Sequence, residues 1–227
     1  MTQRDAGILA DADIAALFES GLLKSARPLD VDQIQPASLD LRLGAKAYRV
    51  RASFMPGPGT PVIDKLERLK LHEIDLTAGA VLETGCVYIV PLLESLSLSP
   101  ELSASANPKS STGRLDIFTR VITDGAQEFD KVPAGYKGPL YLEVSPRTFP
   151  IVARTGSRLS QIRFRKGRAQ LSEAELATLH QNETLVASEM PNISGGGIAL
   201  SVDLSGGEDK LIGYRGKHHT AVVDVDK

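Results

Sequence analysis

The sequence predicts a mainly β protein, folded as a barrel or sandwich, with one short helix before the β region and another after it. Short runs of apolar and β-branched residues alternate with polar residues along most of the chain. Glycine, proline, aspartate and serine separate these runs at short intervals. The chain has 227 residues, 42% of them hydrophobic, which is enough to bury the core of one full domain and leave an additional segment.

The first predicted element is a helix near the N-terminus. Asp11 belongs to a residue type that caps helices. The apolar side chains that follow at helical spacing are Ile14, Leu17, Phe18 and Leu22. One face of this helix is therefore expected to be buried.

The chain after this helix is predicted to be β structure. From Ser38 to Leu43, leucine alternates with polar residues, which is the pattern of a half-buried strand. Residues 54–70 carry three early prolines and two glycines and then charged residues, and are predicted to form a surface excursion. Further strands are expected at residues 46–51, 80–82, 86–92, 117–122, 140–144, 149–153 and 160–164.

The character of the sequence changes after this β region. Ser172 followed by Glu175 is the signature of a capping box and predicts a short helix. Three consecutive glycines, 195–197, then interrupt the chain. We therefore expect one domain at residues 1–167. Residues 168–227 are expected to hold a helix, a glycine-rich connection and the start of a second β unit.

Composition argues against several classes of function. The formal net charge is -2, so the chain lacks the positive balance typical of nucleic-acid-binding proteins. Cys86 is the only cysteine, which rules out an intrachain disulfide and a metal site built on several cysteines. No stretch approaches the ~20 apolar residues of a membrane span, and the first residues do not resemble a signal peptide. We expect a cytoplasmic protein without a nucleic-acid or membrane partner.

The segment NPKSSTGR, residues 107–114, is the first candidate site. Ser110 and Ser111 can donate hydrogen bonds to phosphate oxygens, while Lys109 and Arg114 supply positive charge. It is not a P-loop, because it lacks the pattern G-x-x-x-x-G-K-[ST]. Turns of this composition are also common on solvated surfaces, so the motif alone leaves both interpretations open.

Glu143, in the strand-like sequence GPLYLEVSP, is the second candidate. Leu140 and Leu142 share one face of the expected strand, and Tyr141 and Glu143 share the other. A partly buried glutamate can act as general base and acid near neutral pH. A carboxylate on a strand can equally well just face solvent, so this segment alone does not decide between the two.

The order of four segments is more specific than any one of them. They are QIQPASLDLRLG (33–44), PKSSTGR (108–114), AGYKGPLYLEV (134–144) and a run ending in QIRF (161–164). In this order they resemble the dCTP deaminase branch of the dUTPase-like superfamily, and ILADADI (8–14) resembles that family's N-terminal helix. The resemblance implies a dUTPase-like β-barrel or sandwich of the β-clip type. It suggests in addition the N-terminal half of a double-length member.

The resemblance also implies roles for individual residues. Glu143 falls at the position of the family's catalytic glutamate, which activates a water for attack on C4 of cytosine. Ser110 and Arg114 fall at positions that place this water and hold the glutamate's geometry and charge. The implied substrate-binding residues are Lys109 and Ser111 for phosphates, Val121, Ile122 and Thr123 for the pyrimidine edge, and Gln161 on the phosphate side.

The implied reaction converts dCTP to dUTP and ammonia in pyrimidine deoxynucleotide metabolism, without a metal at the reacting carbon. A zinc-activated water would require H-x-E together with P-C-x-x-C, and the sequence contains neither. We expect no zinc and no metal site in the protein, with Mg²⁺ entering on the substrate triphosphate. The expected nucleotide ligands are dCTP and dUTP, and dTTP as in some relatives.

Two alternative functions stay open. The first is a dUTPase-type pyrophosphatase, disfavoured because Pro133 stands where an aspartate commonly precedes a family turn. Asp124, Glu128 or Asp130, in a longer loop just before that turn, could substitute for this aspartate. The second is a non-catalytic nucleotide-binding or oligomerisation half of a larger enzyme. Because dUTPase-like sites are assembled between neighbouring units, the resemblance implies a homotrimer or a pseudo-trimer with a related second half.

Overall fold

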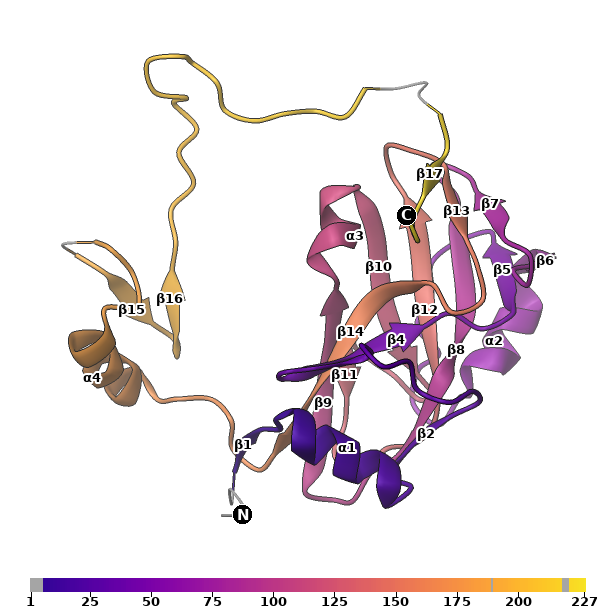
Figure 1. The fold of residues 1–227 in the computed structure, drawn as a ribbon, viewed down its shortest axis with the longest axis horizontal. Helices are drawn as coiled ribbons and strands as arrows, with labels where there is room; N and C mark the ends of the chain where they lie inside the picture. The colour runs from indigo at the N-terminus through magenta and orange to yellow at the C-terminus, as the bar shows by residue number, and fades with distance from the viewer. Residues whose placement is uncertain (1–5, 189, 218–220) are drawn as a thin grey trace. The chain divides into compact units, whose positions relative to one another are not determined.

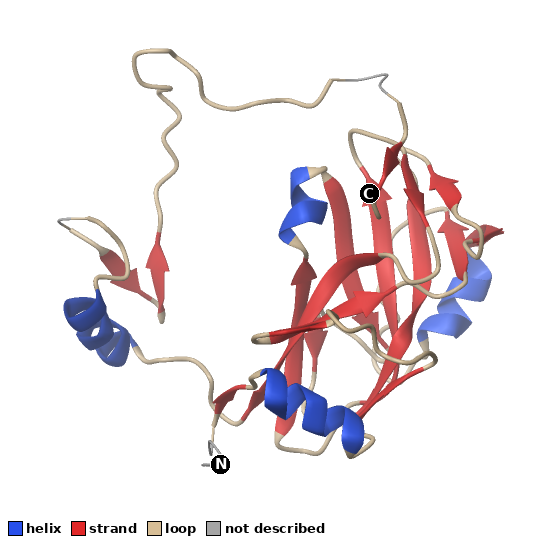
Figure 2. Cartoon of the chain, viewed as in Figure 1, coloured by secondary structure: helices blue, strands red, loops and turns tan. Residues whose placement is uncertain are grey.

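A computed structural model of the chain describes residues 6–188, 190–217 and 221–227. They form two compact units. The first contains the residues up to Gly167 together with Lys217–Lys227, and the second contains Arg168–Gly216. Strands dominate the first unit, with three helices around them (Figures 1 and 2). The prediction of a mainly β fold is therefore confirmed.

One six-stranded sheet places the first and fourth family-like segments, 33–44 and 161–164, beside the phosphate-type motif. Its strands are β1 (Gly7–Ile8), β3 (Ile34–Gln35), β4 (Ser38–Arg42), β9 (Leu102–Pro108), β11 (Lys131–Val132) and β14 (Arg158–Lys166). Their order is β11-β9-β14-β4-β3, with β1 paired to β14. Because β14 lies between β4 and β9, Gln161 pairs with Asp40 on one side and with Asn107 on the other.

A second six-stranded sheet carries Glu143. Its strands are β2 (Leu23–Ser25), β5 (Lys46–Val50), β6 (Lys70–Asp75), β8 (Val87–Ser97), β10 (Ile117–Thr123) and β12 (Lys137–Pro146). Their order is β10-β12-β8-β5-β6, with β2 paired to β8. Each strand expected between residues 46 and 164 overlaps an observed strand, whereas β9 was not among the predicted elements.

The main hydrophobic core draws side chains from both sheets, including Leu41, Leu142 and Phe164. Helix α1 (Asp11–Glu19) packs Ile14 and Leu17 against it, as its spacing predicts. The predicted cap is wrong by one residue. Ala10 is the N-cap, and the side chain of Asp13 accepts a hydrogen bond from the Ala10 N–H at 3.2 Å, so Asp11 is already the first helical residue.

Strand β4 is buried on both faces, which corrects the prediction of a half-buried strand. Its polar side chains are buried because each has a charged or polar partner. Arg42 donates from Nε to Glu94 at 2.9 Å, and Asp40 forms an ion pair with Lys109. Ser38 donates to the side-chain oxygen of Gln161 at 3.0 Å.

The region 54–70 is not only a surface excursion. It contains helix α2 (Val62–Leu69), whose side chains Val62 and Leu66 are fully buried. Together with Phe54 they form a second hydrophobic cluster, which packs on the face of the second sheet opposite the main core. The prolines that suggested a loop lie before the helix, where proline is tolerated.

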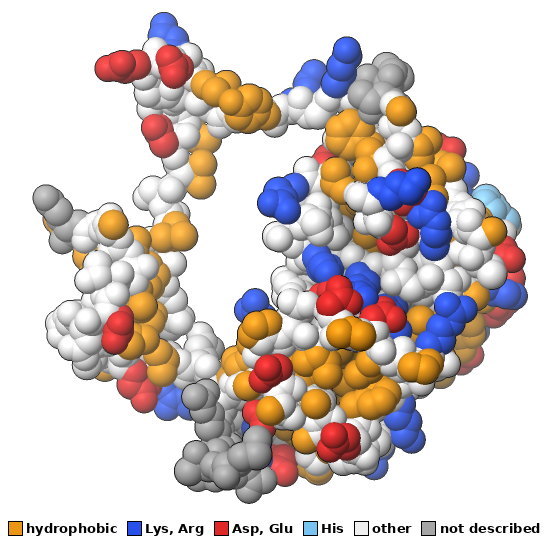
Figure 3. Space-filling model, in the orientation of Figure 1, with side chains coloured by type: hydrophobic (Ala, Val, Ile, Leu, Met, Phe, Trp, Pro, Cys, Tyr) orange, Lys and Arg blue, Asp and Glu red, His pale blue; other side chains and the backbone are white. Residues whose placement is uncertain are grey.

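The second unit is small. Helix α4 (Glu173–Glu183) begins with the predicted capping box, since Ser172 accepts from the Glu175 N–H and Glu175 accepts from the Ser172 N–H. The glycines predicted to interrupt the chain instead turn a hairpin between β15 (Asn192–Ser194) and β16 (Gly197–Ala199). The next apolar side chains, Leu200, Val202 and Leu204, are exposed to solvent. Figure 3 shows hydrophobic side chains on the surface of this part of the chain.

The last strand, β17 (Val223–Asp224), belongs to the first unit. It pairs in parallel with β13 (Ile151–Ala153), which also pairs with β7 (Ala80–Leu82) to give a three-stranded sheet (Figure 1). Among the helices that the structure describes, none is long and apolar enough to cross a membrane.

Candidate active site

Glu143 lies in the middle of β12 with its side chain almost completely buried, at 2% exposure. On β10 its direct partner is Arg120, and on β8 it is Ile89. Arg120 donates to Oε1 of Glu143 from Nη2 at 2.6 Å and from Nε at 3.0 Å. The Oε2 atom is buried and has no hydrogen-bond partner among the described residues.

The guanidinium of Arg120 is itself held by groups from β10 and from two loops. Its carbon lies 3.5 Å from the centre of the Phe129 ring and 4.9 Å from that of Phe118. Its Nη2 donates to Oγ of Ser53 at 2.7 Å. The Arg120 side chain remains 25% exposed, so it forms the boundary between Glu143 and solvent.

The face that carries Glu143 also carries the second hydrophobic cluster. Tyr141 and Ile122 point to this face and are buried there with Ile89. Burial raises the pKa of Tyr141 to about 12, so its hydroxyl stays protonated at neutral pH. Glu143 therefore has one apolar side and one cationic side, and this arrangement can hold a carboxylate ready to accept a proton.

The predicted pyrimidine-reading segment lies on β10, which is the edge strand of its sheet. Asp130 forms hydrogen bonds with both backbone polar groups of Val121. Its Oδ1 accepts from the Val121 N–H at 2.8 Å, and its own N–H donates to the Val121 carbonyl at 2.9 Å. Burial raises the pKa of Asp130, although the Val121 hydrogen bond acts in the opposite direction. Ile122 and Thr123 are buried, and Oγ1 of Thr123 has no partner in the described part of the chain.

The predicted phosphate motif forms a short helix, α3 (Ser110–Arg114), rather than a simple turn. Ser110, Ser111 and Arg114 are exposed on it. Helix α3 precedes β10, whose first residue pairs with Pro146, three residues beyond Glu143 on β12. That offset is about 10 Å along a strand. No hydrogen bond or ion pair joins Ser110 or Arg114 to Glu143 within the described residues of this single chain.

Lys109 and Gln161 come together at one end of the first sheet. Lys109, the residue before α3, forms an ion pair with the buried carboxylate of Asp40. Gln161 is the strand partner of Asp40 and accepts from Ser38. Two residues that are far apart in sequence, both predicted to lie on the phosphate side, are thereby placed in one neighbourhood.

A pocket of about 490 Å³ lies beside α3 and the start of β10. Its volume is in the range of small-molecule sites. Gly113 lines it from the helix, and Phe118 lines it from the Glu143-bearing face of β10. Arg147 adds a positive charge at its wall. Phe118, which lines this pocket, also lies beside the guanidinium of Arg120.

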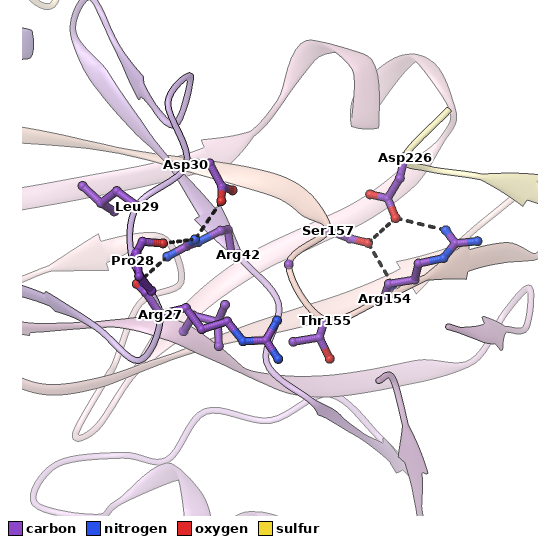
Figure 4. A pocket seen from close by; sticks show the side chains of 11 residues that line it. Arg27, Pro28, Leu29, Asp30, Arg42, Arg154, Thr155, Ser157 and Asp226 are labelled. Atoms are coloured by element: carbon purple, nitrogen blue, oxygen red, sulfur yellow. Dashed lines mark hydrogen bonds and ion pairs between the residues drawn. The ribbon is translucent and has the colours of Figure 1, made fainter. Parts of the chain in front are cut away.

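A larger pocket, of about 520 Å³, lies elsewhere on the first unit (Figure 4). Its charged side chains are mostly paired with one another. Arg154 binds Asp226 at 3.1 Å, Asp226 also accepts from Ser157 at 2.7 Å, and Arg42 is paired with Asp30 at 3.3 Å. The contacts of Arg154 and Ser157 with Asp226 hold the C-terminal segment in place, so we do not assign a nucleotide to this pocket.

Arg120 is the partner of Glu143 that sequence reasoning missed. The sequence IFTRVIT gives no signal for it, because only the strand register shows that this arginine is opposite the glutamate. Among the residues that the structure describes, no group of three or more His, Cys, Asp or Glu side chains could hold a metal ion. His218 and His219 lie outside the described residues.

Comparison with known families gives two matches that together cover most of the chain. Residues 5–168 match the model described as the 2'-deoxycytidine 5'-triphosphate deaminase N-terminal domain. Residues 172–227 match the model for the C-terminal domain of the same protein. The narrower expectation, that the chain resembles the N-terminal half of a double-length member, is not borne out by these matches.

Individual relatives agree with the family models. A protein of Tropheryma whipplei named "dCTP deaminase, dUMP-forming" is 31% identical over 158 residues, covering 69% of this chain and 76% of its own. One of Halorubrum lacusprofundi named "dCTP deaminase" is 34% identical over 161 residues, with the same coverage.

A crystal structure of 2'-deoxycytidine 5'-triphosphate deaminase from Agrobacterium tumefaciens is 75% identical in sequence to this chain. It matches 99% of the chain with a TM-score of 0.90. The match spans 66% of the length of that protein, so this relative is longer than the chain described above.

Proposed function

The chain belongs to the 2'-deoxycytidine 5'-triphosphate deaminase family, and from this membership we propose that it hydrolyses dCTP to dUTP and ammonia in the cytoplasm. The predicted dUTPase-like fold is confirmed by the similarity to the Agrobacterium structure. The activity is proposed on two grounds, the family match and the geometry around Glu143.

The observation that carries the proposal is that, among the described residues, only one of the two carboxylate oxygens of Glu143 has a hydrogen-bond partner. Arg120 donates two hydrogen bonds to Oε1, whereas Oε2 is buried and has no partner among the described residues. A buried polar atom without a partner is costly and is retained at sites where a ligand supplies the missing contact. A water bound to Oε2 would be such a ligand, and it is the nucleophile that deamination requires.

In the proposed reaction Glu143 removes a proton from this water, and the resulting hydroxide attacks C4 of the cytosine ring. The proton then passes from Glu143 to the amino nitrogen, the bond from C4 to that nitrogen breaks, and ammonia leaves. The carboxylate is regenerated, the proton of the new C4 hydroxyl moves to N3, and the ring becomes uracil. No metal takes part in this sequence of steps, since one glutamate moves the proton in both directions.

The triphosphate is proposed to bind at α3. Ser110 and Ser111 are exposed and can donate hydrogen bonds, while Lys109 and Arg114 supply charge. Gln161 lies in the same neighbourhood through its pairing with β4. Mg²⁺ is expected to arrive with the nucleotide and to neutralise part of its charge. The backbone of Ile122 and Thr123 is proposed to bind the pyrimidine, whereas that of Val121 becomes available only when Asp130 is displaced.

We propose that the complete site contains residues of two chain copies, as in a homotrimer or pseudo-trimer. This arrangement would bring Ser110 and Arg114 of one copy to Glu143 of another, because a single chain does not join them. To test this, the inactive variants Arg114→Ala and Glu143→Gln are mixed, unfolded and refolded together. Mixed oligomers should regain part of the parent activity, whereas absence of any recovery would contradict a shared site.

A second candidate product is dUMP, because some relatives carry the name "dCTP deaminase, dUMP-forming". Two carboxylates of the inserted loop already have structural partners: Asp124 binds the N–H of Val62, and Asp130 binds Val121. Of the three candidate carboxylates in this loop, Glu128 is the exposed one. Pro133 stands where an aspartate would be expected. We therefore propose that the reaction ends at dUTP. dTTP is a candidate for a further ligand of the same site.

The proposed activity is tested by incubating the chain with dCTP and Mg²⁺ while ammonia and nucleotides are followed. A parallel sample is treated with a zinc chelator and resupplied with Mg²⁺. dUTP and ammonia in both samples would support metal-free deamination. Formation of dUMP would show that the chain also has the pyrophosphatase activity. Nucleotide binding without turnover would favour the non-catalytic alternative.

A further inference from the structure

We infer that Arg120 is the positioning residue of the reaction: it fixes one oxygen of Glu143 so that the other is aimed at the attacking water. This inference rests on the proposed function. It assigns a role to a residue that lies outside the four family-like segments.

The geometry of the pair carries the inference. Both Arg120 bonds, at 2.6 and 3.0 Å, end on Oε1, and the two residues are direct partners across β10 and β12. A guanidinium that served charge neutralisation alone could bind both carboxylate oxygens side by side, which is the common arginine–carboxylate arrangement. Binding to one oxygen instead fixes the carboxylate rotation and leaves the lone pairs of Oε2 free.

The surroundings of Arg120 hold the guanidinium at this position. The Phe129 ring lies 3.5 Å from its central carbon, and Ser53 accepts its remaining Nη2 hydrogen bond at 2.7 Å. Phe129 also packs against the second hydrophobic cluster, so the inserted loop is anchored to the same surface. A rotation of Arg120 away from Glu143 would lose the stacking and the Ser53 bond together.

The ion pair between Arg120 and Glu143 differs from a surface ion pair because it is largely buried. The Glu143 side chain is 2% exposed, and that of Arg120 is 25% exposed. Exposed pairs contribute little, since solvent competes for both partners. Here the carboxylate has no solvent to orient it, and Arg120 is its only hydrogen-bond partner in the described part of the chain.

The test compares Arg120→Ala with the parent chain in dCTP turnover. Loss of the fixed geometry should lower kcat about 100-fold, because small misplacements of a reacting group are costly. KM should change much less, since the proposed nucleotide contacts are made by other residues. Guanidinium at tens of millimolar, too dilute to unfold a protein, should restore part of kcat by entering the vacated space beside Phe129. Methylammonium, with one nitrogen, should restore less.

Three further variants define the controls. Arg163→Ala removes an exposed arginine of β14 and should leave kcat, KM and the guanidinium response unchanged. Arg120→Met keeps an unbranched side chain beside Phe129 without the guanidinium, and it replaces the alanine variant if that one does not fold. Arg120→Lys keeps the charge without the planar fork, so its kcat should lie between those of Arg120→Met and the parent.

The outcomes separate this inference from the proposed function. An inactive parent chain overturns both. An active parent whose Arg120→Ala or Arg120→Met variant keeps its kcat, or loses activity only through KM, overturns the positioning role alone. Rescue of kcat by guanidinium in Arg120→Ala, but not in Glu143→Gln, supports it.

Discussion

Asp40 links the buried part of the first sheet to the phosphate motif. Its carboxylate is 2% exposed and is paired with Lys109, while Arg158 lies 3.7 Å away. A buried carboxylate fixes the position of its cationic partner more strongly than an exposed one does. Lys109 has three N–H donors and uses one for Asp40, so the others remain for a phosphate.

Replacement of Lys109 by alanine should weaken nucleotide binding about tenfold, because a charge-assisted hydrogen bond to a phosphate is lost. The loss of affinity should be largest at low salt, because the attraction between Lys109 and the phosphate is screened least there. Calorimetric titration with dCTP at two salt concentrations measures both effects. Lys137→Ala, on an exposed side chain of β12, is the control. Equal affinity of Lys109→Ala and parent would refute the assignment.

Glu143→Gln should abolish turnover while leaving the fold and triphosphate binding nearly intact. The amide has almost the same shape as the carboxylate but cannot accept the proton, and loss of a general base costs at least about 100-fold in rate. Ammonia release and a thermal melt measure the two properties. Glu19→Gln, at an exposed position of α1, should behave like the parent. Substantial turnover by Glu143→Gln would exclude Glu143 as the base.

The sequence supports prediction of the site only in part, for a physical reason. Glu143 and the KSSTGR segment carry chemistry in their own residue types, so the sequence alone makes them candidates. Arg120 and Ser53 matter through position alone. Arg120 meets Glu143 only after strands β10 and β12 pair in one register, and Ser53 accepts a hydrogen bond from Arg120. The two-sided burial of β4 was missed for the same reason: the partners of its polar residues lie far away in sequence.

The N-terminus of helix α2 is capped by a residue from a distant part of the chain. Its N-cap is Pro61, which has no side-chain oxygen, and the N–H of Val62 donates instead to Oδ1 of Asp124 at 2.7 Å. The inserted loop that begins at Asp124 thus caps the helix that covers the Glu143-bearing face. Two elements that local patterns present as separate loops form one structure.

Asp124→Ala should destabilise the chain by about 1 kcal/mol, the usual effect of removing a helix cap. Asp124→Asn keeps an oxygen at the same place and should lose clearly less. The midpoints and slopes of urea unfolding curves give the free energy of unfolding of both variants. If the asparagine variant were as unstable as the alanine variant, the capping interaction would not be the cause.

Element prediction was most accurate where apolar periodicity is strong and least accurate where it is diluted. The sequence of β9, LSASANP, offers mostly small residues and gives no strong β signal, yet β14 and β11 pair with it on both sides. α2 was hidden by the three prolines before it, although Val62 and Leu66 are at helical spacing. In both cases tertiary contacts decide the structure of the segment.

At the scale of the whole molecule, the chain leaves the first unit after Gly167 and returns to it at its C-terminal strand. The returning segment is held by backbone bonds from Val223 and Val225 to the strand β13 region and by Arg154. Arg154 binds both oxygens of Asp224, at 2.6 and 2.8 Å, and its side-chain hydrogen bond holds the pKa of Asp224 well below the usual range.

This pair predicts acid release of the C-terminal strand. A carboxyl whose pKa is lowered by folding stabilises the folded state above its unfolded pKa of about 3.9, and this stabilisation is lost as the pH falls further. Protection of the Val223 and Val225 amides against hydrogen exchange should therefore hold from pH 7 to about 5 and decrease below about 4. In Asp224→Asn the protection should already be weak at pH 7. Equal protection in variant and parent would contradict the role of the pair.

The return of the C-terminal strand also decides how the chain responds to cleavage. A protease cut between residues 168 and 216 would leave the C-terminal strand held on the first unit by non-covalent contacts, among them the β13–β17 pairing, the Arg154 ion pairs and the Ser157–Asp226 hydrogen bond. Before the cut this contact is intramolecular and is favoured by the high effective concentration of a tethered segment. After it, the same contact becomes a bimolecular equilibrium. A nicked chain should thus keep its tail in concentrated solution and lose it on dilution, in the manner of a split protein.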